Sequence, residues 1–207
     1  MVTIVHQQGN TEKVDAILQA AQKRLGRYGF EKTTMSEIAA DVHMSKASLY
    51  YYFPDKENLL RAVLYKELAE YFCLIGERMK ELDDPEEMIR EFIRMRHEFF
   101  TTFLNLAKFR FSNFYQIRPH FQELISELRS KESELFNEIL SQGIKEGLFV
   151  IEDPEGTGLI FLEIIHSLRL LVIRNRNIQD LTREDFDQMY EKHRHFLDLF
   201  IRGIRKH

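Results

Sequence analysis

Helix start signals follow one another at short intervals in residues 33–60, and this spacing constrains the fold more than any other feature of the chain. Thr34 and Glu37 form a capping-box pattern, in which each side chain can bond a free backbone amide at the start of a helix. Ser45 can cap a second helix, and Asp55, which follows a proline, can cap a third. The stretch therefore predicts two short helices joined by a tight turn and followed by a long helix.

The second short helix, predicted over residues 46–52, presents side chains that are poor material for a protein core. It carries a cation, a small hydroxyl and three phenols, at Lys46, Ser48, Tyr50, Tyr51 and Tyr52. Groups of these kinds donate hydrogen bonds to phosphates and to base edges in a DNA groove. We therefore interpret residues 33–60 as a helix-turn-helix segment that binds DNA.

Helical periodicity continues through the rest of the chain, because strand-like alternation is nowhere sustained and only four prolines and nine glycines occur. Start and stop signals predict helices over 11–28, 35–42, 46–52, 56–80, 85–106, 121–145, 155–174 and 182–204, with an irregular aromatic segment around 109–119. We expect an all-α protein of about nine helices. A three-helix DNA-binding head, residues 1–54, is joined by the long helix to a larger helical body, residues 55–207.

Composition and motifs exclude several other classes of protein. The single cysteine, Cys73, rules out an internal disulfide and a cysteine-based zinc site, and we interpret it as a small buried apolar residue. No nucleophile–base pair, glycine-rich phosphate loop or metal-ligand spacing is present, so we expect neither an enzyme nor a cofactor nor a metal. No leader segment or membrane-spanning run is evident. We therefore expect a cytoplasmic protein without a membrane partner.

Charge is distributed unevenly along the chain, whose formal net charge is −4. Residues 1–56 contain seven Lys/Arg and six Asp/Glu, a net charge of +1. The remaining residues contain 22 Lys/Arg and 27 Asp/Glu, a net charge of −5. A near-neutral head on an acidic body is compatible with DNA binding when the cations share one face.

The two C-terminal helices are apolar over more of their circumference than one neighbour can cover. One interpretation is an internal core. The other is a two-fold dimer, in which this helix pair packs against its copy. For the dimer we predict an interface formed by Phe161, Ile165, Leu168, Phe196, Phe200 and Ile204.

The segment from Ile17 to Leu60 closely resembles the DNA-binding head of TetR-family transcriptional regulators. The resemblance covers about a fifth of the chain and depends on the combined spacing of several short motifs. These are Ala20-Ala21, Gly29-Phe30, Thr33-Thr34, Ile38-Ala39, Ser45-Lys46, Leu49-Tyr50, Phe53 and Lys56-Glu57. The rest of the chain is similar to the family in the number and order of its helices.

This resemblance implies a homodimer whose two heads bind double-stranded DNA at a palindromic operator. It implies a repressor that leaves the operator when a small-molecule effector binds the C-terminal body. It also implies DNA contacts by position. Backbone phosphates would be bound by Thr34, Ser45, Lys46, Tyr50, Tyr52 and Lys56, and bases would lie nearest Ala47, Ser48 and Tyr51. His43 departs from the family pattern, because it stands in the turn where glycine is usual and must adopt a left-handed backbone at a cost of about 1 kcal/mol.

Aromatic residues are dense in the middle of the body and suggest an effector pocket, although a phenylalanine-rich stripe also suits a plain core. The predicted pocket residues are His97, Phe100, Phe103, Phe109, Phe114, Tyr115, Phe121 and His166. Arg110, Arg118 and Arg169 would instead admit an anionic effector.

Two rival functions remain beside the ligand-responsive repressor. An architectural DNA-binding protein of the same fold would have a closed, fully packed body. An enzyme built of helices would need catalytic motifs, and the sequence contains none that we recognise.

Overall fold

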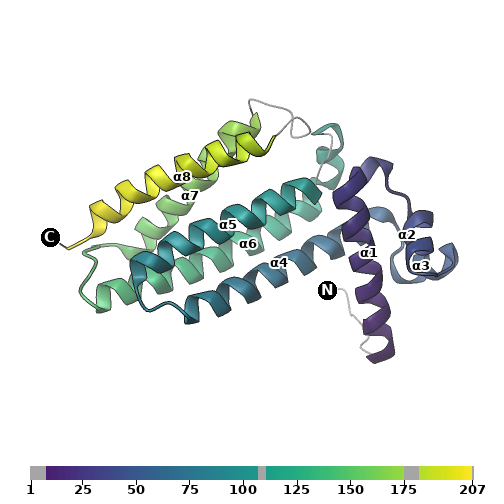
Figure 1. The fold of residues 1–207 in the computed structure, drawn as a ribbon, viewed down its shortest axis with the longest axis horizontal. Coiled ribbons are helices and arrows are strands. Elements are labelled where there is room, and N and C mark those ends of the chain that lie inside the picture. The colour runs from purple at the N-terminus through teal and green to yellow at the C-terminus, as the bar shows by residue number, and fades with distance from the viewer. Residues whose placement is uncertain (1–7, 107–110, 175–181, 207) are drawn as a thin grey trace. The chain divides into compact units, whose positions relative to one another are not determined.

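The computed structural model describes the backbone of residues 8–106, 111–174 and 182–206, and the side chains of residues 11–101, 122–169 and 182–206. Within these ranges the chain forms eight helices. They are α1 (Gln8–Lys32), α2 (Met35–Asp41), α3 (Lys46–Tyr52), α4 (Lys56–Lys80), α5 (Pro85–Leu106), α6 (Phe111–Lys145), α7 (Pro154–Arg174) and α8 (Arg183–Ile204). The predicted all-α class is confirmed, with eight helices in the described residues instead of about nine (Figure 1).

The main difference in helix bounds is at α6, which begins at Phe111 and not near residue 121. The aromatic segment around 109–119, predicted to be irregular, is therefore helical from Phe111 onward. Pro119 lies inside this helix. Proline removes one backbone hydrogen bond from a helix, yet its fixed φ is compatible with helical geometry, so it need not end the helix.

Two compact units make up the chain, and each is described by itself. The head unit comprises Met1–Ala69 and Phe103–Phe121, and the body unit comprises Glu70–Thr102 and Gln122–His207. Helix α4 is therefore shared between the two units. The predicted boundary between residues 54 and 55 separates the DNA-binding part from the rest by function. The division into compact units does not test it, so this boundary stays a prediction.

The head unit buries one apolar stripe from each of its helices. α1 packs on α2, and α2 on α3. Their common core consists of Ile17, Ala21, Leu25, Phe30, Met35, Ile38, Leu49, Leu59 and Leu60, each at most 5% exposed. These positions recur every three to four residues, the period that places side chains on one face of a helix. α3 contributes only Leu49 to this core, so its remaining side chains are left for another role.

A kink at Gly29 interrupts α1 near its C-terminal end. Gly29 has φ 77° and ψ 168°, a region of backbone conformation that is essentially restricted to glycine. The chain changes direction here, and Thr33 donates its hydroxyl hydrogen to the Gly29 carbonyl at 2.8 Å before α2 begins.

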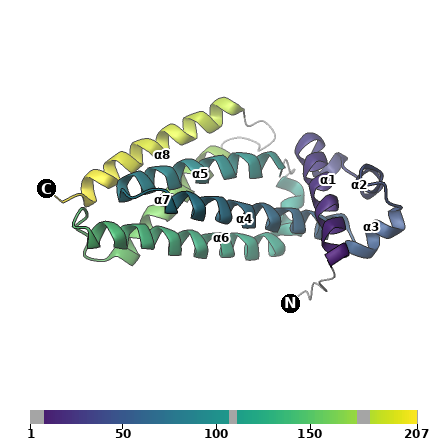
Figure 2. The ribbon, with the colours of Figure 1, turned by 60° about the horizontal axis from the view of Figure 1, so that its bottom comes forward.

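Phenylalanine rings form the centre of the body unit. Phe136 of α6 stacks on Phe161 of α7 with centroids 4.6 Å apart, and Phe92 of α5 packs at 5.4 Å from Phe136. Phe196 and Phe200 of α8 lie against the other side of Phe161, at 5.5 and 4.4 Å. α8 crosses α7 in Figure 1 and runs beside α5 in Figure 2, so the four helices share one aromatic core.

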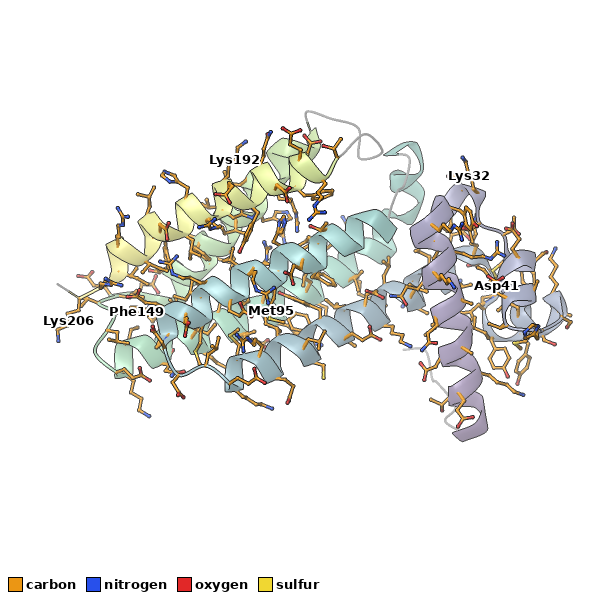
Figure 3. All side chains as sticks on the ribbon, in the orientation of Figure 1. Lys32, Asp41, Met95, Phe149, Lys192 and Lys206 are labelled. Carbon is orange, nitrogen blue, oxygen red and sulfur yellow. The ribbon has the colours of Figure 1, made fainter. Side chains whose placement is uncertain are left out.

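A short backbone pairing closes one end of the body unit. The Val150 amide donates to the Ile204 carbonyl at 2.8 Å. The Lys206 amide donates to the Leu148 carbonyl, also at 2.8 Å. This isolated antiparallel bridge, near the Phe149 and Lys206 side chains that Figure 3 labels, ties the α6–α7 connection to the end of α8. It is the one β-type pairing within the described residues.

Candidate DNA-binding helix and body cavity

The predicted caps position the two short helices of the head. Thr34 and Glu37 form the complete capping box of α2, with the Thr34 amide donating to the Glu37 carboxylate at 2.9 Å. Ser45 caps α3 by accepting the amide hydrogen of Ser48 at 3.0 Å. Both predicted N-caps are therefore confirmed, and they set the first residue of each helix.

The turn between α2 and α3 contains the predicted strain. His43 has φ 53°, the only positive φ outside glycine in the described residues. The amides of His43 and Met44 donate to the Ala40 and Ala39 carbonyls at 3.1 and 2.8 Å, which closes the end of α2. These bonds hold the left-handed residue in place and fix the angle at which α3 leaves α2.

The outer face of α3 leaves polar and aromatic side chains exposed. Tyr51 is 82% exposed and Tyr50 is 41% exposed, which is unusual for aromatic rings on a folded unit. The Lys46 ammonium lies 5.8 Å from the centre of the Tyr50 ring, and Ala47 is also exposed. The Ser45 and Ser48 hydroxyl oxygens are 2.8 Å apart, so one donates to the other and one hydroxyl hydrogen is left available. This face combines a cation, hydroxyls and phenols, which are groups that can bind the phosphates of a nucleic acid.

Two predicted phosphate ligands instead make internal contacts. The Lys56 ammonium donates to the Phe30 and Thr33 carbonyls at 2.8 and 2.9 Å and lies 4.2 Å from the centre of the Phe30 ring. An ammonium has three hydrogens, so one remains for a phosphate. The Thr34 hydroxyl donates to Glu37 at 2.7 Å, and the Thr34 amide bonds the same carboxylate. Both residues thus hold α4 and α2 in the position from which α3 is presented.

An ion-pair cluster connects α1 with α2. Arg24 pairs with Asp41, which Figure 3 labels at the end of α2, through a bond of 2.9 Å and a second contact, and lies 3.3 Å from Glu37. The hydrogen bond from the Arg24 guanidinium holds the pKa of Asp41 below its ordinary value. The carboxylates of α2 are thereby neutralised locally, which reduces their repulsion of a phosphate backbone near α3.

A cavity of about 230 Å³ lies in the body unit between α5, α6 and α7. Its lining is mainly polar: Arg96, Arg129, Glu132, Ser133, Glu163, His166 and Ser167, with Leu159 and Leu162 as the apolar part. Arg96 and Glu132 are 4% and 1% exposed, so two charges are buried at its wall. A concave site that combines apolar surface with several convergent polar groups can hold a small molecule.

Buried charges beside the cavity form one connected cluster. The Arg96 Nε donates to Glu132 Oε1 at 2.7 Å, and the Tyr71 hydroxyl donates to the same oxygen at 3.3 Å. Arg169, 7% exposed, lies with its guanidinium carbon 3.5 Å from the centre of the Phe100 ring. Its Nη2 is 2.6 Å from Nδ1 of His166. Because a guanidinium only donates, Nδ1 accepts, and the ring proton of neutral His166 is on Nε2.

Burial lowers the pKa values of the two basic groups, Arg169 and His166, in this cluster. Desolvation and then the neighbouring Arg96 lower the pKa of Arg169 to about 9, so its side chain is still charged at neutral pH. Desolvation and Arg169 lower the pKa of His166 to about 3, which keeps the imidazole neutral. Nη1 of Arg169 makes no hydrogen bond within the described residues although it is buried. A buried guanidinium with an unused donor is costly and calls for an acceptor.

The structure describes the side chains of only three predicted pocket residues, and they lie in different places. His166 lines it, and Phe100 lies behind it, under the guanidinium groups of Arg96 and Arg169. His97 instead stacks on Tyr190 at 4.7 Å, and its buried Nδ1 has no partner in the described part of the chain. Phe109 lies outside the described residues, as do the side chains of Phe103, Phe114, Tyr115 and Phe121. Cys73, expected to be buried, is exposed.

In the structure, the residues of the predicted dimer interface fall into a buried group and a partly exposed group. Phe161, Ile165 and Ile204 are at most 7% exposed and belong to the core of a single subunit, because α7 packs on α6 and α8. These three therefore cannot form the outer surface of an interface, and the prediction is corrected for them. Leu168, Phe196 and Phe200 are partly exposed. The large apolar side chains that α7 and α8 do expose are Leu159, Ile160 and Leu199, at 52%, 58% and 55%.

The sequence contains an indication of the charged cluster, which a search for apolar periodicity alone does not detect. Arg96 lies four residues from both Phe92 and Phe100, on the buried stripe of α5. Glu132 lies four residues from Leu128 and Phe136 in α6, and Arg169 lies four residues after Ile165 in α7. A charge in the middle of an apolar stripe must be buried with a partner. Three such charges on three helices indicate a common site.

Other kinds of site find no support in the described residues. Within them, no group of histidine, cysteine, aspartate and glutamate side chains could hold a metal ion. A search of the same residues gives no helix with the length and apolar character that crossing a membrane requires.

Comparisons with known proteins agree with this arrangement. The family model "Bacterial regulatory proteins, tetR family" matches residues 17–63, and the model "Tetracyclin repressor-like, C-terminal domain" matches residues 82–170. The crystal structure of a transcriptional regulator from Cytophaga hutchinsonii superposes with a TM-score of 0.89 and is 32% identical. That alignment covers 94% of this chain and 99% of the other.

Curated relatives match over shorter stretches. The HTH-type transcriptional regulator RutR of Escherichia coli is 36% identical over 42% of this chain and 40% of its own length. The HTH-type transcriptional repressor NicS of Pseudomonas putida is 31% identical over 44% of this chain and 45% of its own length. The match thus spans less than half the length of these curated relatives.

Proposed function

The chain belongs to the TetR family of transcriptional regulators, and from this premise we propose that it is a homodimeric repressor that a small molecule releases from a palindromic operator. Its relatives are transcriptional regulators and not enzymes. The single observation that carries the proposal is the exposed face of α3, held by the caps at Thr34 and Ser45, in the position of the recognition helix. A DNA-binding regulator acts where the chromosome lies, which for a bacterial protein is the cytoplasm.

Each part of the α3 face has a proposed role. Lys46, Tyr50 and Tyr52 would bind phosphates, with Ser45 at the helix start. Ala47, Ser48 and Tyr51 would lie at the base edges, where the Ala47 methyl can contact a thymine methyl and the Ser48 hydroxyl can bond a base. Thr34 and Lys56 would chiefly position α3 and α4, with one Lys56 hydrogen left for a phosphate.

The body supports regulation by a ligand more than a purely architectural role. An architectural protein would have a closed, packed interior, whereas the described body contains a cavity of about 230 Å³ lined by polar groups. Helix α4 begins at Lys56 in the head and continues through residues 70–80 of the body unit. A change in the body that tilts α4 would therefore reach the head and alter the spacing of two recognition helices in a dimer.

Selection from random double-stranded DNA tests the proposed function. Immobilised full-length protein should enrich an inverted repeat whose half-sites are about one helical turn apart, or a multiple of it. A pool that yields no repeated motif after several rounds would exclude a sequence-specific regulator. The selected fragment then serves as the operator in the measurements below.

Lys46→Ala should weaken binding to the selected fragment and to unrelated DNA by a similar factor. The reason is that a phosphate contact is sequence-independent, and its loss reduces the counterions released on binding. The slope of log affinity against log salt concentration should become shallower by about one for each bound subunit that lacks the Lys46 contact. Fluorescence anisotropy over a salt series measures both quantities.

Lys192→Ala is the matched control, because Lys192 is an exposed lysine on α8 in the body unit (Figure 3). It should leave affinity and salt slope unchanged. If Lys46→Ala behaved like this control, α3 would not face the DNA backbone as proposed.

Ile160→Glu should convert the proposed dimer to monomers. Ile160 is 58% exposed in a single subunit, so a glutamate there does not disturb the subunit core, but it would place a charge in an apolar α7–α8 interface. Sedimentation velocity should show the loss of the dimer, and operator affinity should fall because two heads no longer bind together.

Leu74→Glu provides the comparison, since Leu74 is 63% exposed on α4, away from α7 and α8 in sequence. This variant should remain dimeric. A wild-type protein that sediments as a monomer, or an Ile160→Glu dimer as tight as the wild type, would place the interface elsewhere.

A further inference from the structure

The cavity of the body unit contains more positive than negative charge within the described residues. Arg96 and Arg129 line it, and Arg169 lies directly behind His166. The carboxylates that face this cluster are Glu132 in the wall and the exposed Glu163 at the rim. Three guanidinium groups against two carboxylates leave one net positive charge beside a partly enclosed space.

The existing hydrogen bonds do not use all the donors of these guanidinium groups. Arg96 gives its Nε hydrogen to Glu132, and no bond within the described residues uses its terminal nitrogens, although Arg96 lines the cavity. Nη1 of Arg169 is buried and has no hydrogen-bond partner among the described residues. Because a guanidinium presents its donors in a planar fork that fits a carboxylate, unused pairs of donors indicate the type of acceptor that is missing.

We propose that this cavity binds a small organic carboxylate, whose anionic head is held by Arg96 and Arg129 and whose apolar part lies against Leu159 and Leu162. The inference rests on the proposed function only in taking this molecule to be the effector. One net positive charge favours a monoanion, because a doubly charged phosphate would leave an excess negative charge beside Glu132 and Glu163. Neutral His166 and the hydroxyls of Ser133 and Ser167 add uncharged hydrogen-bonding groups to the same wall.

A carboxylate would also complete the electrostatics of the buried cluster. Arg169 shares no carboxylate within hydrogen-bond reach in the described residues, and it is held against Phe100 and His166. A further negative charge in the cavity would offset the desolvation that lowers the pKa of Arg169. The guanidinium carbons of Arg96 and Arg169 lie 5.0 and 3.5 Å from the centre of the Phe100 ring. Movement of either guanidinium on binding would therefore displace Phe100 and, with it, α5.

Thermal unfolding of the full-length protein tests the proposal. Acetate, benzoate and octanoate are each compared with sodium chloride at the same ionic strength. At about ten times its Kd, a carboxylate that binds only the folded protein should raise the unfolding midpoint by about 3 °C. Benzoate and octanoate should act at lower concentration than acetate, because they can bury an apolar part against the two leucines.

Variants assign the effect to the cavity. Arg129→Gln alters an exposed side chain and should leave the fold intact, yet it should weaken carboxylate binding by about tenfold or more, the usual consequence of losing a charged hydrogen bond. Arg169→Met should weaken binding in the same direction. Arg202→Gln, at an exposed position on α8 that does not line the cavity, is the control and should respond as the wild type does.

Three results would overturn the proposal. One is an absence of any rise above chloride in the wild type with all three carboxylates. Another is a rise of equal size in the wild type and in Arg129→Gln and Arg169→Met. The third is an equal or larger rise with uncharged octanamide or with dianionic octyl phosphate, which would exclude a monoanionic head.

The selected operator fragment separates this proposal from the proposed function. Carboxylate that stabilises the protein without releasing the fragment would support the binding site and contradict its role in regulation. A protein that binds the fragment but gains no stability from carboxylate would keep the DNA-binding function and overturn the carboxylate site.

Discussion

Glu132→Gln should lower the free energy of unfolding by about 3–5 kcal/mol, the usual cost of removing one partner from a buried ion pair. Glu132 is 1% exposed and accepts hydrogen bonds from Arg96 at 2.7 Å and from Tyr71 at 3.3 Å. Glutamine keeps the volume but removes the charge, so the buried guanidinium groups of Arg96 and Arg169 would lose their neutralising neighbour. Urea unfolding at pH 7.5, followed by circular dichroism, measures the difference.

Two further variants separate the charge effect from a change of shape. Glu134→Gln alters an exposed glutamate two residues along the same helix and should cost little. Arg96→Met combined with Glu132→Gln should cost less than the sum of the single changes, because the double variant no longer buries an unpaired charge from this pair. A Glu132→Gln variant that unfolds within about 1 kcal/mol of the wild type would show that the cluster is hydrated and not buried.

Stability should also fall steeply as the pH is lowered below 6.5, because the body buries neutral histidines. Desolvation, followed by the charge of Arg96, lowers the pKa of His193 to about 4, against an ordinary value of 6.5. His97 of α5 and Arg169 of α7 add to this lowering, whereas the bond from His193 to the Ile165 carbonyl, at 3.1 Å, opposes it. His166, with a pKa lowered to about 3, behaves in the same way.

The sign follows from which state binds the proton. The unfolded chain protonates these histidines near pH 6.5, whereas the native protein resists protonation until about pH 4 or 3. Their contribution is therefore fully present above pH 6.5 and is lost as the pH falls. The loss approaches about 1.4 kcal/mol per pH unit for each histidine. Glu91, whose pKa Arg94 and Arg78 lower to about 2, adds its own loss only below about pH 4.5.

His193→Gln tests this assignment, since its amide can still donate to the Ile165 carbonyl but cannot titrate. Urea unfolding between pH 7.5 and 5 should show a pH slope reduced by about one proton relative to the wild type. His195→Gln is the matched control, because His195 is exposed on the same helix and should leave the slope unchanged. Equal slopes in the wild type and His193→Gln would mean that His193 is protonated in the folded protein.

The turns and helix caps of the head could be predicted from the sequence because they depend on local chemistry. The Thr34–Glu37 box, the Ser45 cap, the left-handed His43 and the positive φ of Gly29 each depend on a residue and its neighbours within four positions. A cap or a turn has the same physical cause in any fold, so these features follow from spacing alone. Local reasoning failed around residues 109–119, which were predicted to be irregular but are helical from Phe111.

The sequence by itself therefore determined the all-α class, the caps of α2 and α3 and the polar and aromatic side chains that α3 presents, because these follow from short-range bonds and periodicity. Tertiary structure decided which apolar faces are covered, and it buried Phe161, Ile165 and Ile204 while leaving Ile160 and Leu199 exposed. It also brought Arg96, Glu132 and Arg169 together from three helices. The spacing within one helix can indicate that a charge is buried, but only long-range packing decides which partner it meets and hence its energy.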